Sequence, residues 1–598
     1  MKRFLLSFTF LTFLLSHLLT ATAQHITHGP VTGALTASSA RMYIRTDAAM
    51  PYTIEVSTQF NYTNPISFND STRPELDNSR IVNITGLQPY TKYYYRVMID
   101  GNQEERSGTF TTFPEDGTKG HYILATGSCQ ETSNMDVFDR ILEIEPLMML
   151  HTGDFTYPSY QMNQDYPENY VPAQESWRRR YNEDRMKDML LTVPIDYVAD
   201  DDDNYNGNCA HYRTGITLDT SSGTVVNGFT LSPVPLHARD NWFHSYVEYF
   251  PGYGMVDTSE GLYHSFKMGN AEFFFMDTRA TADPSSEAYV YDSVANQWSF
   301  APDSTHRIIS VNQMNWLKNA LTNSTADWKF LVGGVPFNKS LRRLINFGLA
   351  AQGFTFNLNG ERGSGFRLAA SFSDYWAGFP HQQEELLNFL ESNTIKDVIF
   401  ISGDTHHNVM DDGTNSGIPE MNASGLSVTN LQLAYWIDYY GQQLGQPHVG
   451  DSLWNGGGNG VNNMNFNNAF GKIEIFEDDS VQLCIIDYEG TVISCMTIVN
   501  STVSAVEEST SSSTKFDILI YPNPSDNIFT IKLPENYFLS GKEKCRITDI
   551  NGRLLSAIDM ENQKGKNTFE VSVQSSPGIY LLEFNTGKKK VEKKLLVK

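Results

Sequence analysis

The chain has 598 residues, of which 40% are hydrophobic and 19% charged, a globular composition that excludes a wholly disordered protein. At roughly 100–200 residues per domain, this length predicts three or four folded units. The formal net charge of -25 would repel nucleic acid and anionic membranes, so no specific nucleic-acid binding is predicted.

The N-terminus has the pattern of a secretory signal peptide. A short basic start precedes an apolar run over residues 4–19, and the small-residue site Ala21–Ala23 follows. The pattern predicts cleavage after Ala23, which removes residues 1–23. A membrane anchor is the alternative, but the cleavage site follows at once and no later segment reaches about 18 uninterrupted apolar residues. No transmembrane segment is therefore predicted.

Residues 24–115 have the pattern of a small β-sandwich. Short β-type runs such as Ala40–Ile44 and Tyr52–Val56 alternate with polar turns, and the run Ile84–Val97 carries alternating aromatic residues after a Gly/Pro turn. Closely spaced short strands with turn signals are typical of such sandwiches. The pattern resembles a fibronectin type III fold.

Over residues 120–499 the pattern changes to apolar strands that end abruptly in Gly, Asp or Asn, with helical segments between them. The clearest segments are the strands Tyr122–Gly127, Leu147–Gly153, Phe273–Asp277 and Val398–Gly403 and the helix Gln382–Leu390. Alternation of strand, loop and helix predicts an α/β domain. Such domains carry their chemistry in loops beyond the carboxyl ends of the strands.

A Ser/Thr-rich linker over residues 500–515 separates this domain from the last part of the chain. In Ser501–Thr514, nine of fourteen residues are Ser or Thr, so the segment should be flexible and solvated. Residues 516–598 return to a β pattern that includes Ile528–Ile531 and Gly578–Leu582. They predict a second small β-sandwich.

The chain has five cysteines, an odd number that cannot all pair within one chain. Cys484 and Cys495 flank a turn-like segment and could form a disulfide. Cys129 and Cys209 need a separate explanation, such as a disulfide between them or, for Cys129, a role as a small buried side chain.

Two Gly-Asp motifs close apolar strands and carry the strongest candidates for chemistry. One is Gly153–Tyr157 with Asp154, and the other is Gly403–His407 with Asp404 and His406. In each, the glycine permits close backbone approach where the strand stops. A carboxylate can bridge two cations, and residues two apart lean toward one face of an extended backbone. Such a pair of motifs resembles the layout of a dinuclear metallophosphoesterase; helix caps or turn aspartates are the alternative.

Further motifs make the resemblance specific. They are Gly127–Gln130, Tyr157 three residues after Asp154, Trp177–Tyr181, Met276–Arg279, Gln313–Leu317 and Asp374–Pro380. With these motifs in order over residues 122–495, the chain resembles the PhoD-like alkaline phosphatases of the metallophosphoesterase superfamily. The resemblance implies a multidomain α/β and β protein: a PhoD-type N-terminal sandwich, a four-layer α/β/β/α metallophosphatase domain and the small C-terminal sandwich.

The resemblance also implies a dinuclear or multinuclear metal centre. Its ligands would be Cys129, Asp154, Tyr157, Asn206, Asp404 and His406. A phenol binds in its deprotonated form at neutral pH only next to a strong Lewis acid, and a thiol is deprotonated on coordination, which favours Fe3+ beside Tyr157 and Cys129. Oxygen ligands from Asp154, Asn206 and Asp404 suit Ca2+, and other divalent ions stay open.

One segment departs from the family pattern. The strand Ile195–Val198 leads into Asp200–Asn208, where Asp202 stands in the place of a histidine that the resemblance predicts. That histidine would stabilise charge or donate a proton near the leaving group, and an aspartate weakens either role. The implied catalytic residues are Asp154, Asp202 and His406.

Neighbouring residues leave alternatives open. Asn206 aligns best as the amide ligand, with Asn208 as the alternative, and Asp200 and Asp201 could belong to a solvated acidic loop. Two histidines could be ordinary hydrogen-bonded residues near the ligands: His151 and His407. Three arginines could hold phosphate oxygens or act as structural ion-pair partners: Arg179, Arg180 and Arg279.

The C-terminal segment carries a second set of motifs. They are Tyr521–Pro524, Asp549–Arg553, Gly578–Leu582 and Lys593–Lys598. In this order they resemble a type A sorting domain of the type IX secretion system. The resemblance implies a Gram-negative host, the type IX machinery as a partner, passage through the periplasm, and a secreted or cell-surface location. A generic adhesion module is the alternative.

Together these patterns predict a secreted, metal-dependent phosphoesterase, an alkaline phosphatase D-like hydrolase of phosphoric ester bonds. The substrate would be a phosphomonoester or a phosphodiester, attacked in line by a metal-activated hydroxide. The alternative is a surface-displayed binding or structural protein on a catalytically weakened phosphatase fold, a role suggested by Asp202 and the flanking β domains.

Overall fold

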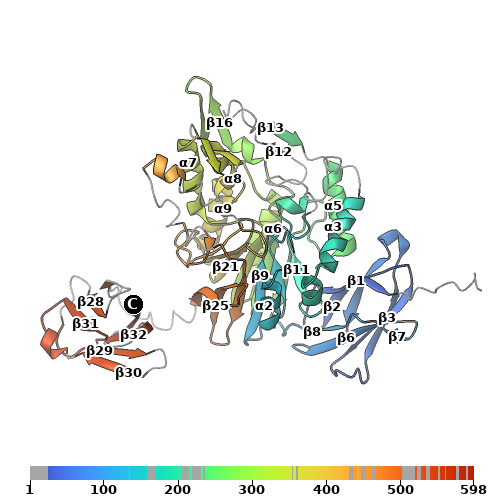
Figure 1. Ribbon diagram of the computed structural model, residues 1–598, viewed down its shortest axis with the longest axis horizontal. Coiled ribbons are helices and arrows are strands. Elements are labelled where there is room, and N and C mark those ends of the chain that lie inside the picture. The colour runs from blue at the N-terminus through green and yellow to red at the C-terminus, as the bar shows by residue number, and fades with distance from the viewer. Residues whose placement is uncertain are drawn as a thin grey trace, which may run out of the picture. The chain divides into compact units, whose positions relative to one another are not determined.

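The structure is a computed structural model. It describes residues 25–598 except for 133–134, 158–169, 205–213, 218–229, 234–235, 353–354, 359–360, 430–436, 438, 446–452, 461–465, 502–518, 522–526, 534–538, 550–552, 559, 574–577, 587–589 and 598. Met1–Ser504 and Ala505–Lys598 form two units, and each is described by itself (Figure 1). The predicted signal peptide and most of the predicted linker lie outside the described residues.

Two antiparallel sheets form the N-terminal part of the first unit, drawn in blue in Figure 1. One has the strand order β1-β2-β5, and the other has the order β4-β3-β6-β7 with β8 paired to β6. The strands are β1 Ile26–Gly33, β2 Ser39–Thr46, β3 Pro51–Ser57, β4 Ile66–Ser71, β5 Ser79–Thr85, β6 Lys92–Ile99, β7 Asn102–Gln103 and β8 Gly108–Thr111. The predicted runs Ala40–Ile44 and Tyr52–Val56 lie within β2 and β3.

Strand β6 explains how this part forms a core. Its side chains alternate between buried and more exposed positions, and Tyr93, Tyr95, Val97 and Ile99 are buried. They belong to the same buried cluster as Ile44 of the other sheet. Successive side chains of a strand point to opposite faces, so the alternating aromatic pattern places one face of β6 in the core.

Asp77 joins the N-terminal strands to helix α3 (Val171–Asn182). Its carboxylate accepts two hydrogen bonds from Arg45 at 2.9 and 3.0 Å, one from Arg178 of α3 at 2.6 Å and one from the Tyr249 hydroxyl at 2.5 Å. Burial alone would raise the pKa of Asp77, but the hydrogen bonds from these three partners lower it to about 2. The N-terminal part is therefore tied to α3 by a charged contact.

We expect Asp77→Asn to lower the free energy of unfolding by roughly 2 kcal/mol at neutral pH, between the cost of breaking an exposed and a fully buried ion pair, because Asp77 and its partners are partly buried. The pKa of Asp77 is about 2 in the fold and ordinarily 3.8, so its charge stabilises the fold above pH 3.8 and ceases to do so as the pH falls towards 2. Chemical denaturation of both proteins over this pH range measures the effect. The difference between them should shrink in acid; a constant difference would contradict the ion-pair explanation.

Two six-stranded sheets form the rest of the first unit. The first has the order β11-β10-β9-β24-β25-β26, in which β9, β10 and β11 are parallel and the other three strands run antiparallel to their neighbours. The strands are β9 Tyr122–Gly127, β10 Met149–His151, β11 Ile195–Tyr197, β24 Ala469–Ile475, β25 Ser480–Asp487 and β26 Val492–Val499.

The second sheet has the order β14-β15-β18-β21-β23-β22. Strands β15, β18, β21 and β23 are parallel, and β14 and β22 pair antiparallel at the two edges. The strands are β14 His264–Met268, β15 Ala271–Met276, β18 Trp328–Gly333, β21 Val398–Ser402, β22 Asn408–Asp411 and β23 Glu420–Ala423.

Helices lie along both sheets (Figure 1). They are α2 Val137–Glu143, α3 Val171–Asn182, α4 Met186–Leu190, α5 Leu236–Tyr249, α6 Val311–Asn323, α7 Arg342–Ala350, α8 Gly365–Phe372 and α9 Pro380–Ser392. Three two-stranded hairpins complete this part: β12 Thr214–Thr217 with β13 Thr230–Pro233, β16 Tyr289–Asp292 with β17 Gln297–Phe300, and β19 Thr355–Leu358 with β20 Glu361–Ser364.

The two large sheets share one core. Leu124 and Leu150 of the first sheet belong to the same buried cluster as Phe273, Phe330 and Ile399 of the second. Other side chains of the first sheet cluster with helices α2 to α5, and other side chains of the second cluster with α6 to α9. Because the central strands are covered on both faces, their sequences are almost continuously apolar. The expected α/β domain is present.

Cys484 and Cys495 form the disulfide that the sequence suggested. They occupy paired positions on β25 and β26. Cys129 is buried and carries a free thiol, as does Cys545, whereas Cys209 lies outside the described residues. Cys129 is therefore not half of a disulfide in this structure.

The second unit holds two antiparallel sheets, with the orders β27-β28-β31 and β30-β29-β32-β33. Its strands are β27 Leu519–Tyr521, β28 Ile528–Lys532, β29 Lys544–Asp549, β30 Leu554–Ile558, β31 Thr568–Ser572, β32 Gly578–Asn585 and β33 Lys590–Val597. Phe529, Ile547, Val571 and Leu582 lie in one buried cluster. The predicted β pattern of this segment is confirmed by these strands.

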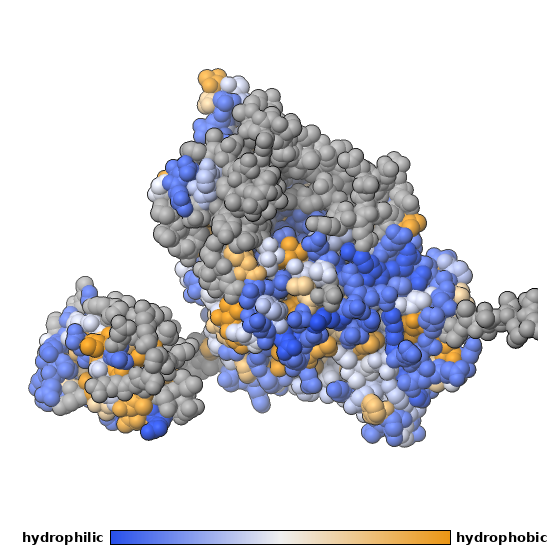
Figure 2. Space-filling view, viewed as in Figure 1, coloured by the Kyte–Doolittle hydropathy of each residue, from blue (hydrophilic) through white to orange (hydrophobic). Residues whose placement is uncertain are grey.

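Figure 2 shows the hydropathy of the residues on one face of the molecule. In Figure 2 the coloured surface over the N-terminal strands is mainly hydrophilic, with apolar atoms in small groups. Scattered apolar groups of this kind are ordinary on a protein surface. Among the described residues, no helix is both long enough and apolar enough to cross a membrane.

Candidate metal centre

Four strands end at the candidate site. Cys129 follows β9, Asp154 follows β10 and the run Asp200–Asp203 follows β11, three neighbouring parallel strands of the first sheet. Asp404 follows β21 of the second sheet. Parallel strands bring their carboxyl ends to one edge, which is where α/β folds place their chemistry.

Both Gly-Asp motifs need their glycine. A Cβ atom on Gly153 would lie 2.3 Å from Asp200 Cβ, and one on Gly403 would lie 2.5 Å from both Ser128 Oγ and the Thr152 carbonyl oxygen. Any larger residue would push apart the loops that carry the candidate ligands. The prediction that these glycines allow close backbone approach is thus confirmed.

The backbone at the candidate ligands is left-handed. Five of the six predicted ligands have positive φ angles: Cys129 at 61°, Asp154 at 54°, Tyr157 at 45°, Asp404 at 72° and His406 at 56°. Residues other than glycine avoid this region, and each such residue costs about 1–3 kcal/mol. Strained backbone of this kind collects at functional sites, where the surrounding structure holds it in place.

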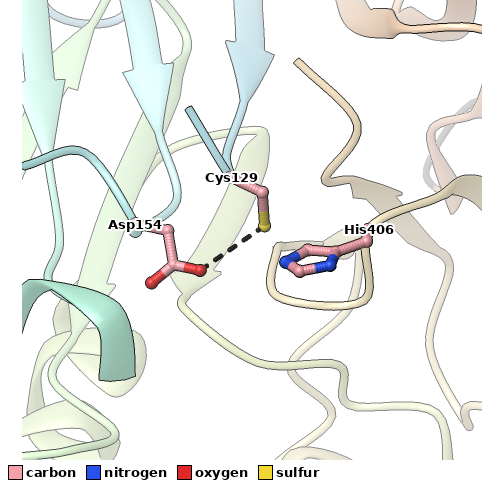
Figure 3. A group of neighbouring side chains, drawn as sticks. All are labelled: Cys129, Asp154 and His406. Atoms are coloured by element: carbon pink, nitrogen blue, oxygen red, sulfur yellow. Dashed lines mark hydrogen bonds between the residues drawn. The ribbon is translucent and has the colours of Figure 1, made fainter. Parts of the chain in front are cut away.

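Cys129, Asp154 and His406 form a first group of side chains (Figure 3). One sulfur, oxygen or nitrogen atom from each lies within 4.8 Å of the other two. Cys129 Sγ is 3.6 Å from Asp154 Oδ2, and the Tyr157 hydroxyl donates to the same oxygen at 3.3 Å. Figure 3 shows the three side chains pointing toward one another from separate loops.

A second group contains four carboxylates. Oxygens of Asp154, Asp200, Asp201 and Asp404 lie within 4.8 Å of one another. Asp154 belongs to both groups, as expected of a bridging carboxylate. Asp200 and Asp201 are 0% and 4% exposed, so the alternative of a solvated acidic loop is wrong for them. Neither was among the predicted ligands, although both follow a strand end as Asp154 does.

The other two aspartates of the acidic run have different surroundings. The Asp202 backbone N–H donates to Asp154 Oδ1 at 3.0 Å, and its side chain is partly buried. Asp203 is fully buried, and its Oδ1 accepts hydrogen bonds from the Phe155 N–H at 2.9 Å and the Thr156 N–H at 2.7 Å. Asp203 therefore fixes the loop that carries Asp154.

Arg279 lies beside the carboxylates. Its guanidinium is 1% exposed, donates to Asp404 Oδ2 at 3.1 Å and pairs with Asp200 and Asp374. Asp201 lies 3.8 Å away. Arg279 thus forms the ion pairs that one of its two predicted roles requires, and its role towards phosphate stays a prediction.

Arg179 and Arg180 of α3 hydrogen-bond to backbone carbonyls of the loops near the site. Arg179 donates to the Thr156 carbonyl at 2.9 Å, and Arg180 donates to the Phe155 carbonyl at 2.5 Å and to that of Gln130. These hydrogen bonds stabilise the loops after β9 and β10. Two histidines are likewise buried and hydrogen-bonded: His151 to Gln130 Oε1 and His407 to the Thr405 carbonyl.

Burial and the close spacing of acidic groups raise the pKa values of the candidate ligands. Burial, and then the neighbouring Asp201 and Asp202, raise the pKa of Asp154 well above its usual value. Burial and then Asp201 do the same for the pKa of Asp404. Burial raises the pKa of the Cys129 thiol and, with Asp154 next in importance, that of the Tyr157 phenol. A bound cation would offset these effects and keep the groups deprotonated.

The donor atoms fit metal ions. A thiol sulfur, a phenol oxygen, an imidazole nitrogen and several carboxylate oxygens converge from separate loops. Soft and hard donors suit a transition metal on the sulfur side and an oxygen-preferring ion among the carboxylates. The cluster could therefore hold metal. The predicted ligand Asn206, with its alternative Asn208, lies outside the described residues.

Fold and site together define an α/β domain with a candidate metal cluster at its strand ends. Residues 124–434 match the PhoD-like phosphatase family, and residues 16–114 match the N-terminal domain of PhoD-like phosphatases. The chain belongs to the PhoD-like phosphatases, a family of phosphoric ester hydrolases. Residues 519–598 match the secretion system C-terminal sorting domain, so the tail carries a sorting signal for export. Both resemblances drawn from the sequence are confirmed.

Similarity to individual proteins is consistent with this family. Alkaline phosphatase D of Bacillus subtilis (strain 168) is 24% identical over 359 residues, which are 56% of this chain and 54% of that protein. The chain thus spans about half the length of the curated relative it matches. The solved structure of PhoD has a TM-score of 0.55 at 17% identity, with 79% of this chain and 90% of that chain covered. This likeness is one of fold.

Proposed function

We propose that this chain is an exported, metal-dependent hydrolase of phosphomonoesters or phosphodiesters. The observation that carries the proposal is the convergence of Cys129, Asp154 and His406 with Asp200, Asp201 and Asp404 at adjoining strand ends. Membership of the PhoD-like phosphatases supports the reaction class. The name of the Bacillus relative, an alkaline phosphatase, agrees with it.

Two kinds of cation would suit the two groups. Fe3+ would lie by Cys129, Asp154 and Tyr157, because a strong Lewis acid is needed to hold a thiolate and a phenolate. Ca2+ or another divalent ion would take carboxylate oxygens of Asp154 and Asp404 together with Asn206. His406 would complete the cluster, and the burial of Asp200 and Asp201 adds them to the candidate ligands.

When bound, such cations polarise phosphoryl oxygens and lower the pKa of a water to about 7. The protein's part is to hold the ligands in a fixed, buried arrangement. Burial, and then Asp201, raise the pKa of Asp202 well above its usual value, an effect that bound cations would oppose, as they would for the neighbouring ligands. The proposed role of Asp202 is to pass a proton to the leaving-group oxygen from the fraction of its carboxyl that stays protonated. In this way Asp202 would replace the expected histidine, beside Asp154 and His406.

We also propose the domain boundaries of the whole chain. Residues 1–23 would be the signal peptide, 24–115 a fibronectin III-like sandwich, 120–499 a four-layer α/β/β/α domain, 500–515 a linker and 516–598 the sorting domain. The two shared-core sheets with helices on their outer faces support the layered domain. The sorting match supports export through the periplasm and the type IX machinery to a secreted or cell-surface location.

Metal analysis and turnover test the proposal on one preparation. We expect the purified protein to contain iron and a divalent ion, and to hydrolyse p-nitrophenyl phosphate or bis-p-nitrophenyl phosphate. Stripping the metals should abolish turnover, and adding them back should restore it, because coordination supplies the chemistry. The ratio of the two rates gives the preference for monoester or diester. A fully metallated protein that hydrolyses neither ester would instead favour the binding or structural role.

A further inference from the structure

The turn Gly403–His407 carries two proposed ligands in strained backbone. Asp404 and His406 have φ angles of 72° and 56°. Such angles persist only when the surroundings hold them. The structure therefore has to contain groups that hold this turn.

Asn422 of β23 makes the contacts that do so. It is fully buried, and its Nδ2 donates to the Gly403 carbonyl at 2.6 Å and to Ser402 Oγ at 3.1 Å. Its Oδ1 accepts from Thr405 Oγ1 at 2.6 Å and from Ser424 Oγ at 2.9 Å. The two ends of one carboxamide thus contact the backbone just before Asp404 and the side chain just after it.

The neighbours of Asn422 complete a buried polar network. Ser402 Oγ donates to Glu420 Oε1 at 2.7 Å, and Ser424 Oγ is 2.9 Å from the His407 carbonyl and 2.8 Å from Thr405 Oγ1. A buried network whose members are hydrogen-bonded makes the structure around it rigid. Only a side chain with a donor and an acceptor at its tip can make both sets of contacts.

We propose that Asn422 is a positioning residue for the metal centre, acting through the Gly403–His407 turn. The hydrogen bonds of its side chain go to the backbone and hydroxyl groups of the turn and its neighbours, so it acts through Asp404 and His406. By holding both in one orientation it raises the affinity of the cluster for its cations. This proposal rests on the proposed function only in taking Asp404 and His406 as ligands.

Two isosteric changes test the role. Asn422→Asp, measured at a pH at which the new carboxyl is ionised, puts an acceptor against the Gly403 carbonyl, and Thr405→Val removes the hydroxyl that donates a hydrogen bond to Asn422. Groups that orient ligands typically contribute about 10–100-fold to metal affinity, so both variants should lose metal at about 10–100-fold lower chelator concentration than the wild type. Thr405→Ser keeps the hydroxyl and should stay close to the wild type.

A matched control separates positioning from general stability. Gln382 of α9 is also buried, and its carboxamide accepts the Ile308 N–H at 2.8 Å and donates to the Ile309 carbonyl at 2.8 Å, away from the ligands and from the Asn422 network. Gln382→Glu should lower the melting temperature yet keep wild-type metal retention. If Asn422→Asp does not fold, Thr405→Val and Thr405→Ser carry the comparison.

The outcomes are distinct. Metal retention in Thr405→Val and folded Asn422→Asp that equals the wild type, with only a lower melting temperature, overturns the positioning role. A wild-type protein that holds metal but hydrolyses no phosphate ester defeats the proposed function and leaves the positioning result standing. A wild-type protein that holds no metal overturns both.

Discussion

Asp154→Asn lowers kcat/KM for p-nitrophenyl phosphate or bis-p-nitrophenyl phosphate by more than about 100-fold, beyond the usual cost of losing a group that merely supports a ligand. Asp154 is the one residue common to both groups of candidate ligands. The amide can still accept the Asp202 N–H, but it lacks the negative charge that bridges two cations. Metal content should fall with activity, which elemental analysis of the purified variant measures.

Asp411→Asn is the matched control. Asp411 is fully buried, and its Oδ1 accepts from the N–H groups of Gly413 at 2.9 Å and Asn415 at 3.0 Å, in a turn outside both ligand groups. This variant should lose stability while retaining metal and specific activity. Near-normal turnover in metal-loaded Asp154→Asn would contradict the assignment of Asp154 as the shared ligand.

Tyr157→Phe removes the phenolate contribution to the visible absorption of the iron-loaded protein and lowers kcat/KM by about 10–100-fold. The Tyr157 hydroxyl lies 3.3 Å from Asp154 Oδ2, where a ferric ion would convert it to a phenolate. Without the hydroxyl, the phenolate-to-iron transition is lost, and the absorption that stays is that of the Cys129 thiolate. Absorption spectra and iron content of the same sample measure the effect.

Tyr181→Phe controls for loss of a buried hydroxyl. Tyr181 is 1% exposed and donates to the Tyr249 carbonyl at 3.1 Å, within the core formed by α3 and α5. The Tyr181→Phe variant should keep both the visible absorption and the iron of the wild type. Iron-loaded Tyr157→Phe with undiminished colour would refute the phenolate ligand specifically, and Cys129 would then be the remaining source of charge transfer.

Much of the fold could be predicted from the sequence because the central strands are covered on both faces. Runs such as Phe273–Asp277 and Val398–Gly403 are almost entirely apolar and end at Gly or Asp, and the structure places β15 and β21 there. The strand predicted over Leu147–Gly153 is shorter in the structure, at Met149–His151. Its last residues form the turn that leads to Asp154.

Three candidate ligands could be predicted from their place in the sequence. Asp154, Asp404 and His406 stood out because they follow Gly at strand ends, and the structure brings Asp154 together with each of the other two. Cys129 and Tyr157 depended on family resemblance, since a lone thiol or phenol carries little signal by itself. The prediction for Asn206 stays untested.

Asp200 and Asp201 were missed for a physical reason. A run of acidic residues ordinarily lies in solvent, because buried charge is costly without a partner. Their partner Arg279 comes from a distant segment, so only the folded chain shows the compensation. Left-handed backbone at residues other than glycine is equally hidden in sequence, and so is the support that Asn422 gives to the Gly403–His407 turn.

The most direct test of the metal centre is an anomalous difference map from crystals of the metal-loaded protein. It should be recorded on both sides of the absorption edge of the metal that elemental analysis finds, which we expect to be iron. We expect a peak among Cys129 Sγ, the Asp154 carboxylate and the His406 imidazole that is present above the edge and absent below it. Metal-containing crystals with no peak at this position would contradict this expectation.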